Sequence, residues 1–282
     1  MKRRAFLQHA ATGLGASVLL PTWLQAAHRS GAFKIGFQSW VVREPLNADF
    51  AGTLKKLAGQ GYESMEMCSP LGYGSYGFGG LAKMPVPEIK RTLDGEGIAC
   101  ESSHFTYPEL TKDLMASVEF AHELGLEQMI VSATNVNERT GTLDDWKKAA
   151  DTMNEWGRKI KENGLPFGFH NHHFEFVEID GQLVYDVLMD RLDPELVAMQ
   201  FQVAVVNIGY HAADYFRKYP GRFVSAHLAD WGGEESGSVP IGQGKVDWPD
   251  FFEAAKVGGL KNLYVEMDQK LLPDSATYLQ SV

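Results

Sequence analysis

Four polar residues each lie near the end of a different short apolar segment, and each could bind a metal ion or move a proton. They are His170, Gln202, His227 and Glu266. Side chains alternate between the two faces of a strand, and the carboxyl ends of parallel strands meet at one edge of their sheet. Imidazole nitrogens and carboxylate oxygens together suit divalent ions such as Zn, Mn, Co or Fe. The sequence therefore predicts that these four side chains form a metal site at one end of a parallel sheet.

Gln202 weakens this predicted metal site. An amide side chain coordinates only through a neutral oxygen, whereas divalent cations of this type gain most from an anionic one. We therefore expect the ion to bind weakly. A single His on a strand is more often a hydrogen-bonded polar group than a ligand, so the prediction depends on several residues converging.

The same side chains suggest catalytic roles. We expect Glu266 to be the general base and Glu175 or His172 to be the opposing acid, because carboxyl and imidazole groups are the usual proton carriers. Other polar and aromatic residues near the segment ends are predicted to bind the substrate. These are Trp40, His104, Asn171, Trp231 and Asp268.

Two common hydrolase motifs do not account for these residues. The segment HNHH at 170–173 lacks the spacing of the HExxH helix of zinc proteases, and the chain contains no GxSxG elbow of a serine hydrolase. Among the other acidic residues, Glu66 and Glu101 are weaker candidates for the site. For Glu63 and Asp230 we expect a salt bridge or a loop cap.

The elements that would position the site alternate regularly along the chain. Predicted strands cover 33–38, 62–67, 98–103, 128–133, 166–171, 198–205, 223–228 and 262–266. Predicted helices, from apolar spacing of three and four, cover 48–60, 87–96, 109–124, 143–163, 181–190, 211–218 and 248–258. Eight strands alternating with helices suit a single closed (β/α)8 TIM barrel, which carries its chemistry at the carboxyl ends of the strands. An open doubly wound sheet is the competing topology, but the GxGxxG turn of such sheets is absent after the first strand, and we expect no nucleotide cofactor.

A glycine-rich segment, LGYGSYGFGG at 71–80, follows the second predicted strand. Its aromatic residues Tyr73, Tyr76 and Phe78 favour a mobile lid over the site. An ordinary surface loop is an equal alternative.

Residues 1–27 have the pattern of an export signal: three basic residues, a weakly apolar stretch and a small-residue end at Ala27. The adjacent Arg3 and Arg4 indicate the twin-arginine type, which delivers folded proteins to the periplasm, and an ordinary secretory signal is the alternative. Residues 28–282 would then form the barrel.

Removal of the signal would change the formal charge from −10 to −13, because the signal holds three basic and no acidic residues. A chain this acidic is poorly suited to nucleic acid or to an anionic membrane surface. The sequence leaves open whether the protein forms a homo-oligomer. Cys68 and Cys100 are the only cysteines, and whether they pair also stays open.

At these residues the chain resembles the xylose-isomerase-like TIM-barrel superfamily, the sugar phosphate isomerase/epimerase group that also includes endonuclease IV. The resemblance covers nearly all of 33–282. It is carried by IGFQSWVVR, GFHNHHFEF, YFRKYPGRFVSAHLAD, IGQGKVDW and YVEMDQ. The motif HNHxFEF, together with PGRF and HxxD, resembles an exported subgroup.

Members of that superfamily typically bind one divalent metal and use glutamates as acid and base on a sugar. The resemblance implies that His227 is the histidine ligand and that Glu266 is the glutamate of the last strand. His170 stands where many members have a glutamate. Gln202 stands where the subgroup usually has an aspartate, and Gln200 also replaces an acid.

We therefore expect a periplasmic sugar isomerase, epimerase or keto-sugar lyase that acts on a small carbohydrate, with 3-keto-glycosides as one substrate class. The chemistry would be metal-assisted removal of a proton next to a carbonyl. The alternative is a catalytically weakened barrel that binds a carbohydrate or a partner protein. DNA repair is the least consistent function, because the chain is acidic and lacks the clusters of a three-zinc site.

Overall fold

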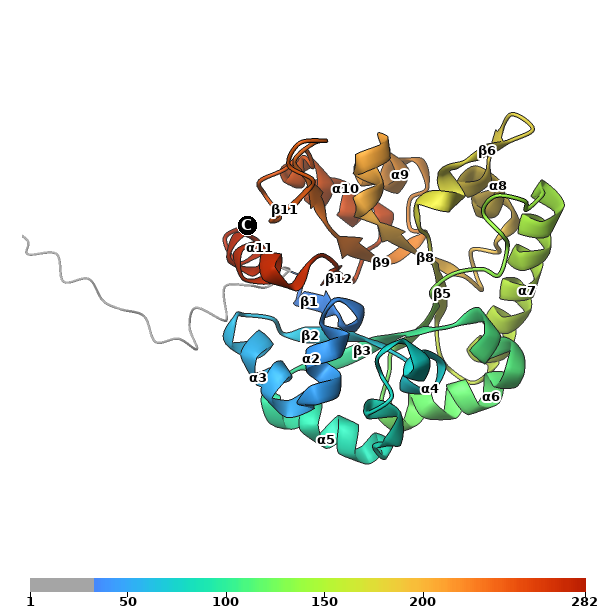
Figure 1. Ribbon diagram of the computed structural model, residues 1–282. Coiled ribbons are helices and arrows are strands. Elements are labelled where there is room, and N and C mark those ends of the chain that lie inside the picture. The colour runs from blue at the N-terminus through green and yellow to red at the C-terminus, as the bar shows by residue number, and fades with distance from the viewer. Residues whose placement is uncertain (1–32) are drawn as a thin grey trace, which may run out of the picture. The chain divides into compact units, whose positions relative to one another are not determined.

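The computed structural model describes residues 33–282, so the predicted export signal lies outside the described residues. Eight parallel strands close into a barrel in the order β1-β12-β9-β8-β5-β4-β3-β2 (Figure 1). They are β1 (Ile35–Gln38), β2 (Ser64–Cys68), β3 (Ala99–Phe105), β4 (Gln128–Val131), β5 (Phe167–His170), β8 (Ala198–Gln202), β9 (Phe223–Leu228) and β12 (Asn262–Val265). All eight predicted strands and the single (β/α)8 barrel are confirmed, and the open-sheet alternative is wrong.

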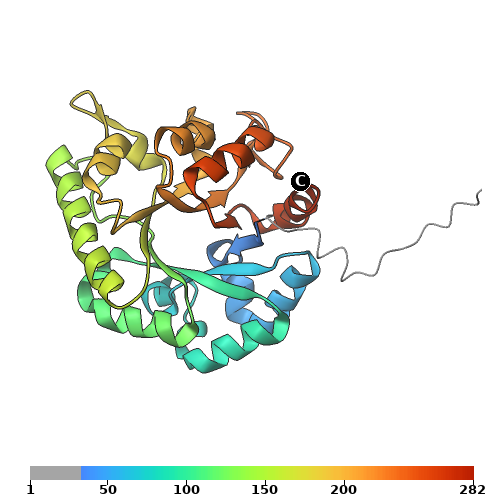
Figure 2. The same cartoon turned by 180° about the vertical axis from the view of Figure 1, so that it is seen from behind.

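Helices surround the barrel on its outer side (Figure 1 and Figure 2). Seven of them lie at the predicted positions: α3 (Phe50–Gly59), α5 (Val86–Glu96), α6 (Tyr107–Leu124), α7 (Leu143–Glu162), α8 (Val184–Arg191), α9 (Ala212–Lys218) and α10 (Trp248–Gly258). Three short helices were not predicted: α2 (Arg43–Ala48), α4 (Pro70–Tyr73) and α11 (Leu272–Leu279). The six residues of α2 and the four of α4 give too short a pattern for periodicity to identify a helix, whereas α11 is as long as α8 and was simply not assigned.

The longest helix, α7, shows why the periodic segments become helices. Thr142 accepts a hydrogen bond from the backbone N–H of Asp145 at 3.3 Å, and the Asp145 carboxylate accepts from the backbone N–H of Thr142 at 3.0 Å. Trp146, Ala150 and Met153 then recur at helical spacing and are buried. Capping fixes where the helix begins, and the apolar stripe fixes which side faces the barrel.

Strand β8 is shorter than predicted, and the difference positions a site residue. The strand ends at Gln202 rather than at 205, and the 3-10 helix η5 (Val203–Ile208) follows it. The Gln202 side chain accepts a hydrogen bond from the backbone N–H of Ala204 at 3.2 Å and so caps this helix. Gln202 therefore lies at the carboxyl end of its strand.

Two kinds of packing hold the barrel together. Large apolar side chains such as Phe105, Phe169 and Phe201 are fully buried in the core. Side chains at the alternate strand positions are largely polar, among them Glu66 and Gln200. Barrel interiors are usually filled by branched apolar residues, and buried polar groups are stable only when they are hydrogen-bonded. The polar interior therefore indicates a site as well as a core.

The glycine-rich segment 71–80 is folded rather than irregular. It contains α4 and the 3-10 helix η2 (Gly74–Tyr76), and the 3-10 helix η3 (Leu81–Lys83) follows. Phe78 is fully buried, and the Tyr73 hydroxyl donates a hydrogen bond to Ser132 Oγ at 2.5 Å. These anchors make the segment a packed cap on the barrel.

Both cysteines, Cys68 and Cys100, are free thiols. Among the described helices, none has the length and apolarity that a bilayer span requires.

Candidate active site at the barrel mouth

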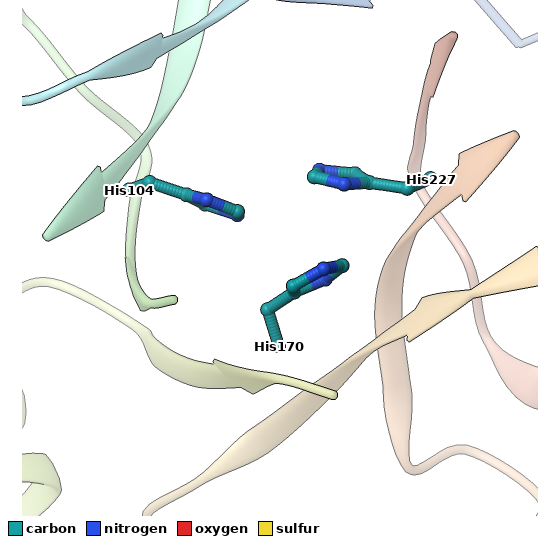
Figure 3. A group of neighbouring side chains, drawn as sticks. All are labelled: His104, His170 and His227. Carbon is teal, nitrogen blue, oxygen red and sulfur yellow. The ribbon is translucent and has the colours of Figure 1, made fainter. Parts of the chain in front are cut away.

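Three histidines from different strands face one another at the mouth of the barrel, where the carboxyl ends of the strands meet (Figure 3). They are His104 on β3, His170 on β5 and His227 on β9, all buried. One ring nitrogen from each lies within 4.8 Å of the others. The ring centroids of His170 and His227 are 4.2 Å apart, and His104 is 5.0 Å from each. We call this group the histidine cluster.

Strand register explains why these rings meet. His170 is the last residue of β5, and Gln202, the last residue of β8, pairs with His227. Gln200 pairs with His170 on the other side of β8. Because side chains alternate along each strand, these positions point to the same interior.

Glu266 lies directly after β12 and completes the predicted set. Its Oε2 atom is 3.0 Å from His227 Nδ1 and accepts a hydrogen bond from Gln202 Nε2 at 2.6 Å. The Glu266 side chain is 21% exposed, whereas that of His227 is not exposed at all. The predicted convergence of His170, Gln202, His227 and Glu266 at one end of the barrel is therefore confirmed, and Glu266 is the member that solvent reaches.

Glu66 on β2 is the main residue that the sequence analysis underrated. This fully buried carboxylate accepts a hydrogen bond from His227 Nε2 at 2.5 Å and lies 3.2 Å from His104 Nε2. Three further donors reach it: Gln38 Nε2 at 2.8 Å, Ser102 Oγ at 2.6 Å and Gln200 Nε2 at 2.7 Å. The signal was present as a charged residue between Met65 and Met67 in the strand SMEMC, at the phase that faces the barrel interior.

The two carboxylates determine the charge of His227. Burial favours neutral imidazole, but Glu266 and Glu66 outweigh it and raise the pKa of His227 to about 10. Burial alone would raise the pKa of Glu66, yet His104 and His227 lower it to about 2. Burial would likewise raise the pKa of Glu266, but His227 beside it lowers that pKa to about 2. His227 is therefore an imidazolium held between two carboxylates.

The other two rings of the histidine cluster are neutral. Burial, with the neighbouring histidines, lowers the pKa of His170 well below its usual range. Burial also lowers the pKa of His104. His170 Nδ1 is buried without a hydrogen-bond partner. Neutral imidazoles are good ligands for zinc and related ions, so the donor set fits a divalent metal.

His104 thus joins the metal-binding candidates, although the sequence analysis predicted it to bind substrate. The amide of Gln202 is engaged on both sides, since its N–H donates to Glu266 and its oxygen accepts from the backbone N–H of Ala204, and its role as a ligand stays a prediction.

Three predicted site residues lie in the segment that follows β5, and they take different positions. The His172 ring lies 4.8 Å from that of His170, and burial lowers the pKa of His172 to about 4, so this imidazole is neutral. Asn171 links the end of β5 to the end of β8, since its Oδ1 accepts a hydrogen bond from the backbone N–H of Gln202 at 3.2 Å. Glu175 is fully buried and accepts from the backbone N–H of His172 at 2.7 Å. Its contacts give Glu175 a role in the turn.

The predicted substrate-binding residues of the rim differ in their surroundings. Trp40 is half-buried and lies beside Tyr73, with 6.1 Å between ring centroids. Trp231 belongs to a short hairpin of β10 (Asp230–Trp231) and β11 (Ser238–Val239). Asp268 is exposed and pairs with Lys270 at 3.0 Å.

Asp230 has the loop-capping role that the sequence predicted. Its carboxylate accepts hydrogen bonds from the backbone N–H groups of the loop 242–246 and from Trp248 Nε1 at 2.9 Å.

Comparison with known proteins identifies the family. A profile described as a xylose isomerase-like TIM barrel matches residues 54–280. The chain belongs to this family. The predicted resemblance to the superfamily is therefore confirmed.

Several curated relatives are inosose dehydratases. Inosose dehydratase 2 of Bacillus cereus is 26% identical over 162 residues, which cover 50% of this chain and 54% of the relative. The inosose dehydratase of Clostridium beijerinckii is 26% identical over 166 residues, covering 51% and 55%. The chain thus spans about half the length of the curated relatives it matches.

Solved structures share the barrel. A sugar phosphate isomerase/epimerase from Parabacteroides distasonis superposes with a TM-score of 0.76 and 24% identity, covering 90% of this chain and 96% of that one. The IolI protein with a bound zinc atom superposes with a TM-score of 0.64 and 15% identity, covering 88% and 96%. Both likenesses support the fold.

Proposed function

We propose that this protein transforms a carbohydrate by removing a proton from the carbon next to a carbonyl group, as a sugar isomerase or epimerase or as a keto-sugar lyase. The observation that carries the proposal is the pairing of Glu266 with the imidazolium of His227. A partly exposed carboxylate and a buried cation lie 3.0 Å apart at the barrel mouth. That combination places a proton acceptor beside a group that stabilises negative charge.

The reaction can be written with the residues of this chain. Both hydrogen bonds to Glu266 reach Oε2, so Oε1 is left to face the substrate carbon and accept its proton. The electron pair of the broken C–H bond moves to the carbonyl oxygen, and His227 stabilises the resulting enediolate. In an isomerase or epimerase the neutral ring of His172, close to His170, relays the returning proton: one ring nitrogen gives its proton to the enediolate while the other takes one from solvent, and Glu266 then releases its proton to solvent. In a lyase the enediolate instead expels a substituent, which leaves with the proton that Glu266 removed.

A divalent metal fits this arrangement, and we propose that the histidine cluster and Glu266 hold it. When bound, such an ion would polarise the carbonyl group and stabilise the enediolate charge. Zinc in the IolI structure supports an ion in this fold, and the unpartnered His170 Nδ1 supports one in this chain. Binding would displace the proton of His227, because an imidazole coordinates in its neutral form.

The relatives support a lyase as one form of this chemistry. Their name, inosose dehydratase, describes removal of water from an inosose. Elimination next to a ketone begins with the same proton removal that we assign to Glu266. The substrate class that follows is a small carbohydrate with a carbonyl group, including 3-keto-glycosides.

Solvent deuterium exchange tests the proposal. Purified protein is incubated in D2O with free aldoses, ketoses and 3-keto sugars, with and without Mn²⁺ or Zn²⁺, and deuterium at the carbon next to the carbonyl is measured. We expect incorporation into at least one of them. No exchange with any sugar, metal present or absent, would refute the enzymatic function.

A second candidate is a barrel that binds a carbohydrate without turning it over. The observation that favours it is the 2.6 Å hydrogen bond from Gln202 to Glu266, which engages the carboxylate that would act as base. The low pKa of Glu266, about 2, also makes it a weak base. Binding of a sugar without any exchange would select this function.

We also propose export to the periplasm by a twin-arginine-type signal, on the pattern of residues 1–27. The protein from a periplasmic fraction should begin near His28 when its intact mass is measured. A soluble cytoplasmic form that keeps Met1 would contradict export.

A further inference from the structure

A group of three aromatic residues lies next to the proposed site, on the side of β1 and β2. These are Trp40, in the turn that follows β1, and Tyr73 and Tyr76, from the glycine-rich segment. Their ring centroids are 6.0 to 6.3 Å apart, so each ring contacts the other two. We call this group the aromatic platform.

The aromatic platform lies at the same end of the barrel as Glu266. Trp40 follows the carboxyl end of β1, and Tyr73 and Tyr76 follow the carboxyl end of β2. The Tyr73 hydroxyl is fixed by Ser132 Oγ, which follows β4 at the mouth. The platform is therefore part of the barrel mouth, where the carboxylate that we assign as base also lies.

Several anchors hold the platform in place. Ser69 Oγ donates to Glu109 on α6 at 2.5 Å, and the backbone N–H of Gly80 donates to Asn47 Oδ1 at 2.6 Å. Arg43 lies over the Trp40 ring at 4.3 Å and donates to the Trp40 carbonyl at 2.8 Å. A surface that is ordered before binding loses little entropy when a ligand arrives.

The outer part of the platform is exposed although it is apolar. Tyr76 is 57% exposed, and Leu71, which belongs to the same helix α4 as Tyr73, is 65% exposed. Aromatic rings with polar edges suit a ligand that has both C–H faces and hydroxyl groups, as a sugar ring has. The guanidinium of Arg43 adds hydrogen-bond donors beside the rings.

We propose that the aromatic platform is a subsite for a second sugar ring, so that the ligand is a glycoside of at least two rings with its reacting ring at Glu266. The exposed ring of Tyr76 would cover one face of this second ring. The reaction part rests on the proposed function, but the binding part does not.

Binding measurements test the subsite without any need for turnover. Sucrose, trehalose, maltose and cellobiose are titrated by calorimetry against the wild-type protein, with glucose as the one-ring reference. We expect at least one disaccharide to bind about tenfold more tightly than glucose, and Tyr76→Ala to remove that advantage while glucose binding stays unchanged. Tyr76→Phe should keep it, because the ring rather than the hydroxyl makes the contact.

Val257→Ala is the matched control, since Val257 is 49% exposed near the end of α10, at the opposite end of the barrel. Circular dichroism melts of each variant check that the fold is retained. The subsite is refuted if no disaccharide binds better than glucose, or if Tyr76→Ala and Val257→Ala bind alike. Deuterium exchange on the same sugars is scored separately, so a binding subsite without turnover would refute the proposed reaction alone.

Discussion

A carboxylate lies on each side of His227, Glu66 in the interior of the barrel and Glu266 at its mouth, and the two have different environments. Glu66 is fully buried and accepts hydrogen bonds from Gln38, Ser102, Gln200 and His227. Glu266 is 21% exposed and accepts only from Gln202 and His227 among these polar side chains.

The difference teaches that an equal pKa does not imply an equal role. Against the effect of burial, the neighbouring histidines lower the pKa of both carboxylates to about 2. Every lone pair of Glu66 that can be used is occupied, so this residue orients His227 and cannot meet a substrate. Glu266 keeps an oxygen at the mouth, so the same charge is available for chemistry.

The largest expected effect comes from removing the buried carboxylate. Glu66→Ala should lower the free energy of unfolding by about 3–5 kcal/mol, because it removes one of the two carboxylates that hold the buried His227 cation and leaves the donors of Gln38, Ser102 and Gln200 without their acceptor. Glu266→Ala should lower it less, because that side chain is partly exposed and His227 keeps Glu66 as its partner. Urea denaturation followed by circular dichroism measures both. Equal losses in the two variants would break the distinction between interior and mouth.

Catalysis should show the opposite order. If the protein is an enzyme, Glu266→Gln should slow deuterium exchange about 10²–10⁴-fold, because an amide cannot accept the proton, while sugar binding is nearly unchanged. Glu253→Gln on the outer side of α10 serves as the control, since its carboxylate contacts only Lys256. Exchange at the wild-type rate in Glu266→Gln would show that another residue is the base, and His172 would be tested next.

Glu175 adds a third carboxyl group to the comparison of Glu66 with Glu266. It is buried like Glu66 but has no cationic partner among the described residues. Burial raises its pKa to about 8, the reverse of Glu66. Below pH 4.5, its pKa in the unfolded chain, Glu175 is protonated in both the folded and the unfolded state and does not lower the free energy of unfolding. Between that value and 8 only the unfolded state loses the proton, so stability falls as the pH rises.

Replacing Glu175 by Gln should remove this pH dependence. Relative to wild type, Glu175→Gln should gain on the order of 3 kcal/mol in free energy of unfolding between pH 5 and pH 8, following the linkage relation. Urea denaturation at the two pH values gives the difference. A constant offset between variant and wild type would mean that Glu175 is ionised in the folded protein.

The smallest expected effect concerns the metal. Gln202→Asp should strengthen Mn²⁺ or Zn²⁺ binding at least about tenfold, equivalent to about 1.4 kcal/mol, because it adds an anionic oxygen next to Glu266. Gln202→Asn is the matched control, because asparagine has the shape of aspartate but carries no charge. Titration calorimetry on the three proteins decides the matter, and equal affinity of the Asp and Asn variants would place Gln202 away from the ion.

The sequence determined the fold and the position of the site along the chain. Strand alternation has a period of two and helix spacing a period of 3.6, and both are local, so all eight strands could be predicted. His170, Gln202, His227 and Glu266 could be located at strand ends for the same reason. The 3-10 turn that shortens β8 was missed, because a side-chain cap on Ala204 leaves no periodic pattern.

Tertiary structure alone decided which of these groups meet. Glu66 and His227 are 161 residues apart, and only closure of the barrel brings their side chains to 2.5 Å. The same closure placed His104 in the histidine cluster rather than at a substrate surface. Glu175, five residues beyond His170, was instead buried in the turn. Local pattern fixes the direction of a side chain, but its partners depend on how distant strands register around the barrel.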